Sequence, residues 1–208
     1  MFPQRLYVFT LSFHLRILEI SSCALQVIIT GTAGSGKSYL INAIEALLGD
    51  TCILTGTTGL AGYNIEGCTL HSALQLPVPN HNNNDLQGTA LQRLQVRFSG
   101  RHYLITEEMS MLGQRTLAWV DKRLRQATGK LNEPLGGISV ILLGDFAQLL
   151  PVGDKRIYAS PSQSSSLLTQ HGHSIYGLFQ TVAMLSENIG QAGSNPETEE
   201  FRAILLRL

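Results

Sequence analysis

The chain has 208 residues, with 15 Lys and Arg against 15 Asp and Glu, which is enough for one domain with a substantial core but not for two large ones. The formal net charge of zero argues against a polybasic coat protein and an acidic tail, so any contact with nucleic acid has to come from local placement of charge. Three cysteines without a C-x-x-C pair indicate neither a disulfide framework nor a zinc knuckle, and no apolar run reaches the roughly 18 residues of a membrane-spanning helix. We therefore expect an intracellular protein in a reducing compartment, without a membrane-spanning segment.

The first 24 residues are predicted to form an arm that leads into the first strand. Their apolar sequence is interrupted by Arg5, His14, Arg16 and Glu19, which leaves no clean apolar region of a secretory signal. Because no acidic residue precedes Glu19, a mitochondrial presequence is an alternative for this segment.

Short β-branched or aliphatic runs, spaced by longer helical or irregular stretches, predict a parallel sheet with crossover connections. We expect five strands at most. They are Leu25–Thr30, Cys52–Thr55, Tyr103–Thr106, Ser139–Gly144 and, as a fifth candidate, Thr181–Leu185.

Two segments have the apolar spacing of amphipathic crossover helices, namely Tyr39–Leu48 and Gln114–Ala127. A short helix is expected around Ile175–Phe179, and another from Pro196 to the end. The Pro- and Asn-rich segment Pro77–Gln87 has turn residues and little to bury, which predicts a mobile loop.

The strongest motif is a phosphate-binding loop of the form G-x-x-x-x-G-K-[ST], directly after the first predicted strand and before a predicted helix. Its residues are Gly31, Thr32, Ala33, Gly34, Ser35, Gly36, Lys37 and Ser38. Glycines let backbone N–H groups turn toward a phosphate chain, and the helix below supplies the positive end of its dipole. We expect Lys37 to reach the β- and γ-phosphates of a nucleotide and Ser38 to hold Mg²⁺.

Two further strand ends carry polar side chains suited to phosphoryl transfer. Glu107 and Glu108 end an apolar strand, where the first would bind Mg²⁺ and the second would accept a proton from the attacking water. Gln148 follows the next strand and could sense the γ-phosphate. The alternatives are a solvated strand end for the carboxylates and an ordinary surface position for the glutamine.

Taken together, these motifs resemble the petite-integration-frequency (PIF) type of DNA helicase, in the 5′-to-3′ branch of helicase superfamily 1. The resemblance runs from about Val27 to Gln191. Its motifs are the P-loop, Ser110-Met111 after the acidic pair, Gly144-Asp145 with Gln148-Leu149-Leu150-Pro151-Val152, Thr58-Gly59-Leu60-Ala61-Gly62-Tyr63-Asn64-Ile65, and Thr69-Leu70-His71-Ser72. It implies an α/β P-loop NTPase fold with a RecA-like parallel sheet, and covers the first of the two RecA-like domains of such enzymes.

The resemblance implies a motor that hydrolyses ATP with Mg²⁺ and translocates on single-stranded DNA in genome maintenance, including repair, recombination and telomere maintenance. By matching position, Lys37, Glu108 and Gln148 are the catalytic candidates. Thr58, Gly59 and His71 would contact the DNA strand. From the residues alone, a Thr-Gly turn and a lone histidine are usually structural. The same family role makes the nucleus the expected compartment, with the mitochondrion as the alternative.

The sequence departs from the family pattern at several positions. Glu107 stands where the family usually has Asp, and Leu150 stands where it has a second proline. Gly190 takes the place of an arginine on the γ-phosphate, a group that contributes roughly 10³–10⁵ in rate to phosphoryl transfer in general. No glutamine lies at the usual distance before the P-loop to read adenine. These departures predict weakened hydrolysis.

The domain organisation predicted from these motifs is a helicase domain over residues 25–191 and a short C-terminal stub over 192–208, with the second helicase domain absent. Since a translocator needs two lobes, we expect a fragment that does not unwind DNA alone. A degenerate nucleotide-binding module is the alternative. A small-molecule P-loop kinase is a third interpretation, which the motif over residues 58–72 disfavours.

Basic residues on and after the helix near residue 120 are interpreted as a solvated face rather than a DNA groove. They are Arg115, Lys122, Arg123, Arg125 and Lys130. Arg93, Arg97 and Arg101, which recur every four residues, receive the same interpretation.

Overall fold

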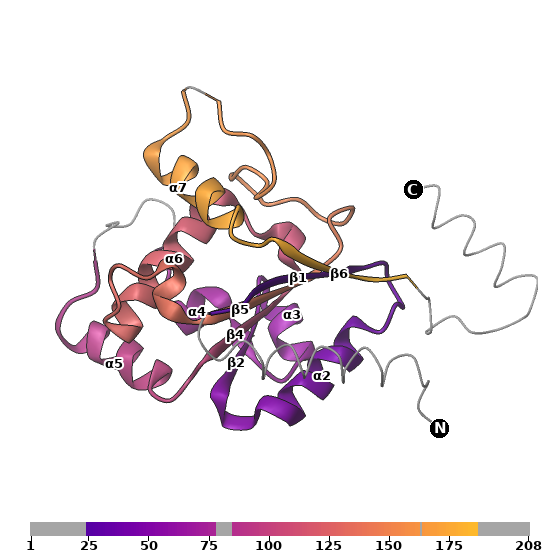
Figure 1. Cartoon of the computed structure of the whole chain (residues 1–208), viewed down its shortest axis with the longest axis horizontal. Helices are drawn as coiled ribbons and strands as arrows, with labels where there is room; N and C mark the ends of the chain where they lie inside the picture. Colours follow the sequence, from indigo (N-terminus) through magenta and orange to yellow (C-terminus); the bar gives the residue numbers. More distant parts are fainter. Residues whose placement is uncertain (1–23, 78–84, 163, 187–208) are drawn as a thin grey trace, which may run out of the picture.

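The computed structural model describes residues 24–77, 85–162 and 164–186 (Figure 1). Its strands are β1 Gln26–Gly31, β2 Cys52–Gly56, β3 Cys68–Thr69, β4 Tyr103–Glu107, β5 Ser139–Gly144 and β6 Thr181–Leu185. Its α-helices are α2 Lys37–Leu48, α3 Gly59–Asn64, α4 Leu70–Leu74, α5 Gly88–Phe98, α6 Gln114–Thr128 and α7 Leu167–Tyr176. Short 3₁₀ turns lie at Gly49–Thr51, Met109–Met111 and Pro134–Gly137. The arm before residue 24, most of the predicted loop, Gly190 and the predicted C-terminal helix lie outside the described residues.

The strands form one sheet in the order β3-β2-β4-β5-β1-β6, and every neighbouring pair is parallel. This confirms the predicted parallel α/β sheet. The expected maximum of five strands is wrong, because β3 adds a sixth strand at one edge. Its two residues pair with Thr55 and Gly56 of β2, and a strand of that length carries no alternating pattern to detect in a sequence.

The predicted crossover helices are confirmed, with α2 starting two residues earlier than expected and α6 ending one residue later. The short helix expected around Ile175–Phe179 is wrong in position, since α7 spans Leu167–Tyr176. The Ser166 side chain accepts a hydrogen bond from the Thr169 amide at 3.2 Å, which caps the true start of this helix. The helices α3, α4 and α5 were not predicted, because each is short or buries only a few side chains.

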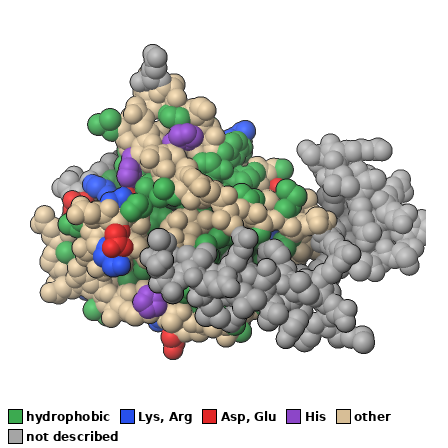
Figure 2. Space-filling model, viewed as in Figure 1, with side chains coloured by type: hydrophobic (Ala, Val, Ile, Leu, Met, Phe, Trp, Pro, Cys, Tyr) green, Lys and Arg blue, Asp and Glu red, His purple; other side chains and the backbone are tan. Residues whose placement is uncertain are grey.

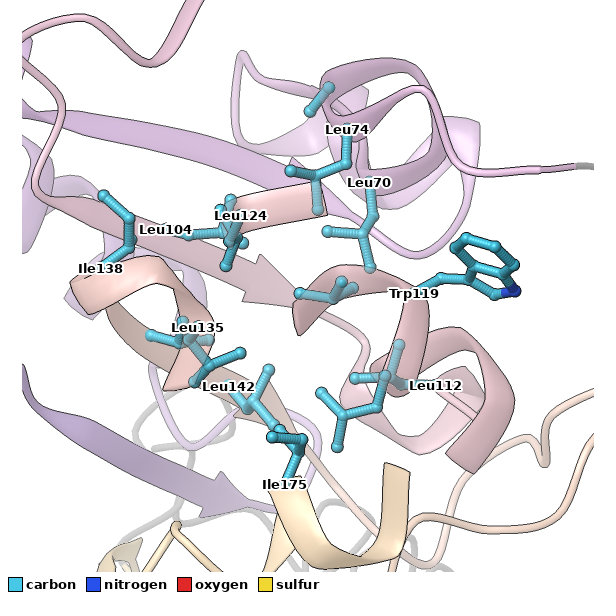
Figure 3. Close-up of a cluster of buried hydrophobic side chains, with 14 of the residues drawn as sticks. Leu70, Leu74, Leu104, Leu112, Trp119, Leu124, Leu135, Ile138, Leu142 and Ile175 are labelled. Carbon is cyan, nitrogen blue, oxygen red and sulfur yellow. The ribbon is translucent and has the colours of Figure 1, made fainter. Parts of the chain in front are cut away.

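The sheet is the middle layer of three. On one face α2 packs Leu40, Ile41 and Ile44 against apolar residues of β1, β2, β4 and β5. The other face is covered by α4, α5, α6 and α7, whose side chains enclose the larger core (Figure 3). In Figure 3, Leu74 and Leu124 point from different helices toward the sheet, while the Trp119 ring lies at the margin. Strands buried on both faces explain the nearly continuous apolar runs of the sequence.

The basic residues around α6 do not form one solvated face. Arg123 is only 2% exposed and donates from Nε to the Gln75 carbonyl oxygen at 3.3 Å, so the interpretation of this residue as solvated is wrong. Arg125 donates to the buried carboxylate of Asp121 at 2.8 Å. On the face shown in Figure 2, Lys and Arg side chains appear in separate small groups rather than as a continuous patch. Within the described ranges, no helix has the length and apolarity to cross a membrane.

Candidate nucleotide site at the carboxyl edge of the sheet

The predicted phosphate-binding loop connects the end of β1 to the start of α2. Gly34 and Gly36 have φ values of +80° and +90°, a conformation that L-residues with side chains rarely adopt. Gly31 approaches the loop closely, because a Cβ there would collide with the buried Ser35 hydroxyl. The glycines of the motif therefore match backbone conformations and close contacts that the loop requires.

Lys37, the first residue of α2, lies across this loop. Its Nζ donates to the carbonyl oxygens of Gly31 at 2.7 Å and Thr32 at 3.0 Å. The ammonium group is thus already held at the mouth of the loop. A phosphate chain would compete with these two carbonyl oxygens for the same protons.

Ser38 and Glu107 come together although they are 69 residues apart. The Ser38 Oγ donates to Glu107 Oε1 at 3.4 Å, while Oε2 is buried without a hydrogen-bond partner among the described residues. Mg²⁺ prefers a few oxygen ligands in combination with nucleotide phosphates. The Ser38 hydroxyl and the Glu107 carboxylate, one oxygen of which has no hydrogen-bond partner among the described residues, fit this preference. Among the described residues no three or more His, Cys, Asp or Glu side chains gather around one point, so the phosphates would have to complete such a site.

The charge of Glu107 is poorly compensated by the protein alone. Burial raises the pKa of this carboxyl, and the neighbouring Glu108 raises it further. The Ser38 hydrogen bond and the Lys37 ammonium lower the pKa, but these are the smaller influences. A cation at this position would lower the pKa of Glu107 again, because it favours the charged carboxylate.

Glu108 has φ +60° and ψ +48°, the left-handed conformation that a glutamate seldom adopts. The backbone around it is fixed by Thr57, whose hydroxyl donates to the Glu108 carbonyl oxygen at 2.9 Å and whose amide donates to the Glu107 carbonyl oxygen at 3.2 Å. On the other side, a Cβ at Gly144 would lie 2.9 Å from the Met109 amide nitrogen. The acidic pair is therefore held between the ends of β2 and β5.

A cavity of about 970 Å³ opens beside the acidic pair. Glu107, Glu108 and Gln148 all line it, together with Thr58. Gln148 reaches it from the loop after β5, where its amide donates to the Asp145 carbonyl oxygen at 3.1 Å. The structure thus brings the predicted metal ligand, base and γ-phosphate sensor to one cavity, next to the P-loop serine.

The three residues predicted to contact DNA lie at or beyond this cavity. The Thr58 hydroxyl accepts from the Ala61 amide at 3.1 Å and caps α3, so it has a structural role in the fold. Gly59 begins that helix, and a Cβ there would meet nothing within 4 Å among the described residues. His71 is an exposed residue of α4, and partial desolvation of its ring lowers its pKa. Their contact with DNA stays a prediction.

Sequence reasoning missed Thr57, which lies beside the acidic pair, and Asp154, which lines a second cavity outside this site. Thr57 was not considered, although it directly precedes the Thr58 motif. Asp154 packs against the start of α6 from a position about 40 residues farther along the chain, and accepts from the amide of Thr116 at 3.1 Å. No local sequence pattern predicts such a contact. Only the three-dimensional structure identifies it.

The comparison that decides the family covers nearly the whole chain. Residues 17–208 match the family described as PIF1-like helicase. The chain belongs to this family. Among curated proteins it is similar to ATP-dependent DNA helicase PIF7 of Trypanosoma brucei brucei, with 37% identity over 148 residues, covering 68% of this chain and 14% of that protein. It is also similar to ATP-dependent DNA helicase Pif1 of a Psychrobacter species, with 33% identity over 143 residues, covering 66% and 22%.

Solved structures agree with the PIF1-like family and its fold. The Pif1 helicase from Bacteroides, in complex with ADP-AlF3 and single-stranded DNA, has a TM-score of 0.67 at 25% identity, covering 94% of this chain and 45% of that one. The Pif1 helicase from Candida albicans has the same TM-score at 23% identity, covering 95% and 42%. Both the predicted PIF-type resemblance and the predicted RecA-like fold are confirmed. The chain spans less than a quarter of the two curated relatives and less than half of these solved chains.

Proposed function

We propose that this chain forms the first motor domain of an ATP-dependent DNA helicase, which binds and hydrolyses ATP with Mg²⁺ and moves 5′ to 3′ on single-stranded DNA. The observation that carries the proposal is the meeting of Ser38 and Glu107 at 3.4 Å, beside a P-loop lysine and above a cavity lined by Glu108 and Gln148. Relatives named as ATP-dependent DNA helicases, and a related structure with single-stranded DNA and a phosphate analogue, support it.

The proposed chemistry assigns each residue one task. Lys37 shifts from the P-loop carbonyl oxygens to oxygens of the β- and γ-phosphates. Ser38 and Glu107 would hold Mg²⁺, which would neutralise charge on the phosphates. Gln148 orients the attacking water, and Glu108 accepts a proton from it. The water oxygen bonds to the γ-phosphorus as the bond from that phosphorus to its bridging oxygen breaks, which releases ADP.

Duplex unwinding needs more protein than the described residues provide. A translocating motor changes the distance between two lobes with each nucleotide state. The described residues form one sheet, and the solved relatives are more than twice as long as this chain. We therefore assign nucleotide chemistry and a share of the DNA path to the described residues.

A second candidate function is nucleotide binding without motor activity. The observation that favours it is Gly190, at the position where the family pattern has an arginine. Loss of such an arginine lowers phosphoryl transfer by roughly 10³–10⁵ in general. In this case ATP would stabilise the protein against heat, but DNA would not stimulate release of phosphate.

The cellular role that fits the family is genome maintenance, including repair, recombination and telomere maintenance. We propose the nucleus as the compartment, with the mitochondrion as the alternative. Fluorescence microscopy of the full chain with a C-terminal tag distinguishes the two, because a tag at that end leaves the first residues free to act as a targeting signal.

The deciding experiment measures phosphate release by the purified chain with and without Mg²⁺ and single-stranded DNA. Turnover that DNA stimulates, and that Lys37→Ala abolishes, supports the motor domain. If ATP binds without turnover, Gly190→Arg is the informative variant. Restored turnover supports a weakened motor, whereas continued binding without turnover contradicts the proposed hydrolysis and supports the nucleotide-binding module.

A further inference from the structure

Asp154 is the acceptor in a contact between the segment after β5 and the start of α6. Its side chain is only 8% exposed, and it accepts from the Arg115 amide at 3.2 Å and from the Thr116 amide and hydroxyl at 3.1 and 3.2 Å. The Lys155 amide donates to the same carboxylate at 2.8 Å. Both oxygens of one aspartate are therefore saturated by protein donors.

These contacts take the place of the N-terminal side-chain cap that α6 lacks. The residue at the cap position is Gly113, which has no side chain to accept from the first amides of the helix. Asp154 supplies the acceptor from a distant segment, and its negative charge lies at the positive end of the helix. Gly113 is required for this approach, since a Cβ there would collide with the Asp154 carboxyl group.

The contact joins two chain segments that both line the cavity beside the acidic pair, one through Glu108 and the other through Gln148. Glu108 leads through the 3₁₀ turn Met109–Met111 to the start of α6, where Asp154 binds. On the other side, Gln148 is joined to Asp154 by five residues. Three of these, Leu149, Leu150 and Val152, are 72%, 43% and 93% exposed, so little packing holds the segment between its ends.

Two anchors therefore fix the loop that carries Gln148. Near β5, the Asp145 side chain accepts from the Ala147 amide at 3.0 Å, and its carbonyl oxygen accepts from the Gln148 amide at 3.1 Å. At the far end, Asp154 ties the loop to α6, and the Lys155 carbonyl oxygen accepts from the Gln114 amide at 2.9 Å. Loss of the Asp154 carboxylate removes the side-chain part of the far anchor, whereas the bond between Lys155 and Gln114 and the bridge between Gly113 and Arg156 remain.

We propose that Asp154 is a positioning residue that holds Gln148 opposite Glu108 during ATP hydrolysis. The absence of a side chain at Gly113 leaves room for the Asp154 carboxylate. This inference rests on the proposed function, because it assigns a task in that reaction. It predicts that loss of the Asp154 carboxylate slows turnover more than it weakens nucleotide binding. A misplacement on the order of 1 Å far from the reacting atoms costs about 10²-fold in rate.

A helix cap also stabilises the fold, so the test needs a matched control. Ser166 caps α7 through its bond with the Thr169 amide at 3.2 Å and does not line the cavity beside the acidic pair. Ser166→Ala removes a smaller, uncharged cap at a residue that lines a second cavity together with Asp154. Asp154→Asn is the milder variant, because an amide keeps one acceptor oxygen and replaces the other by a donor.

The kinetic test measures kcat and KM for ATP in the presence of single-stranded DNA. We expect Asp154→Ala to lower kcat about tenfold and to change KM less than about threefold. The kcat of Asp154→Asn should lie between those of Asp154→Ala and wild type. Ser166→Ala should leave kcat and KM unchanged. Combining Asp154→Ala with Gln148→Ala should be no slower than Gln148→Ala alone, since the first acts through the second. Additive losses, or an equal loss in Ser166→Ala, overturn the proposal.

Hydrogen exchange separates this inference from the proposed function. In the full chain, the amides of residues 145–150, 152 and 153 should exchange faster in Asp154→Ala than in wild type or Ser166→Ala, with and without ADP and aluminium fluoride. If the wild-type chain shows no turnover, the proposed hydrolysis fails. Hydrogen exchange alone then tests whether Asp154 anchors the loop that carries Gln148. Equal exchange in these amides for Asp154→Ala and Ser166→Ala overturns the anchor even when turnover is present.

Discussion

The nucleotide side of the molecule and the segment from α3 to α4 differ in how they are built. At the nucleotide side, Glu107 is buried to 7% exposure and Glu108 adopts a left-handed conformation. In the segment from α3 to α4, Thr58 and Thr69 cap short helices and His71 is exposed. Both regions hold a glutamate in the left-handed conformation, since Glu66 between α3 and α4 has φ +53°, but Glu66 is exposed, whereas the nucleotide side buries the carboxylate of Glu107.

This difference teaches which functional assignments a sequence can support by itself. Binding of a phosphate chain requires special backbone conformations and buried charge, so it restricts residue types at many positions. Contact with a DNA backbone requires only exposed donors, which many ordinary helix ends provide. The nucleotide assignment therefore has geometric support, and the DNA assignment depends on the family. The experiments below test that asymmetry in order of expected effect.

The largest effect is expected from Glu108→Gln, which removes the proposed base and keeps the shape of the side chain. Turnover should fall on the order of 10²–10³-fold, while the affinity for ATP should change less than about threefold. Stopped-flow phosphate release and binding of a fluorescent ATP analogue measure the two quantities. Equal losses in turnover and affinity would show that Glu108 helps to bind the nucleotide instead.

Lys37→Ala is expected to weaken ATP binding about 100-fold, because each charge-assisted hydrogen bond to a phosphate contributes about 1.5–3 kcal/mol. Isothermal titration calorimetry gives the affinity. Lys130→Ala is the matched control, because its ammonium group pairs with Glu133 on the surface at 3.1 Å, away from the P-loop. An equal loss of affinity in both variants would mean that the P-loop lysine has no special role.

The four central strands β1, β2, β4 and β5 could be predicted because they are covered on both faces and hence read as apolar runs, whereas the edge strand β6 leaves Val182 and Met184 exposed. The two-residue β3 could not be predicted, since it has too few residues to show a period. The start of α7 was within reach of sequence reasoning, because Ser166 is a typical N-cap residue before an apolar run. The prediction of a short helix around Ile175–Phe179 overlooked this signal and so placed the helix too late.

Some contacts of the candidate site could likewise be predicted from the sequence, and others could not. The pairing of Ser38 with Glu107 was anticipated, since parallel strands deliver their carboxyl ends to one edge of the sheet. The buried state of Arg123 and the contact between Asp154 and Gly113 were not. Both depend on which distant segments meet, and a single sequence contains no record of such pairs.

A moderate effect is expected from Thr58→Ala, which removes the cap of α3 in the segment assigned to DNA. The free energy of unfolding should fall by about 1 kcal/mol, which lowers the melting temperature by about 2–4 °C. Thr69→Ala is the control, because Thr69 caps α4 through the Ser72 amide at 3.1 Å. If both variants lose this stability but only Thr58→Ala weakens DNA binding, Thr58 contacts DNA in addition to capping its helix.

The smallest effect is expected from His71→Ala. Desolvation lowers the pKa of His71 below its ordinary value, so the ring is neutral at pH 7.5 and would bind a DNA phosphate by a hydrogen bond without net charge. One such bond contributes about 0.5–1.5 kcal/mol, which predicts a loss of roughly three- to tenfold in affinity. Because a neutral donor releases no counterion, the dependence of affinity on salt should keep its slope. Fluorescence anisotropy with labelled single-stranded DNA, repeated at several salt concentrations, measures both quantities.

The control for this variant is His102→Ala, since His102 is exposed just before β4, at the opposite end of the strands from the P-loop. Wild-type affinity in His71→Ala, or an equal loss in His102→Ala, removes α4 from the DNA path. A salt slope shallower by about one unit would instead mean that DNA binding protonates the ring. In that case the affinity of wild type should rise as the pH falls toward 6, and the affinity of His71→Ala should not.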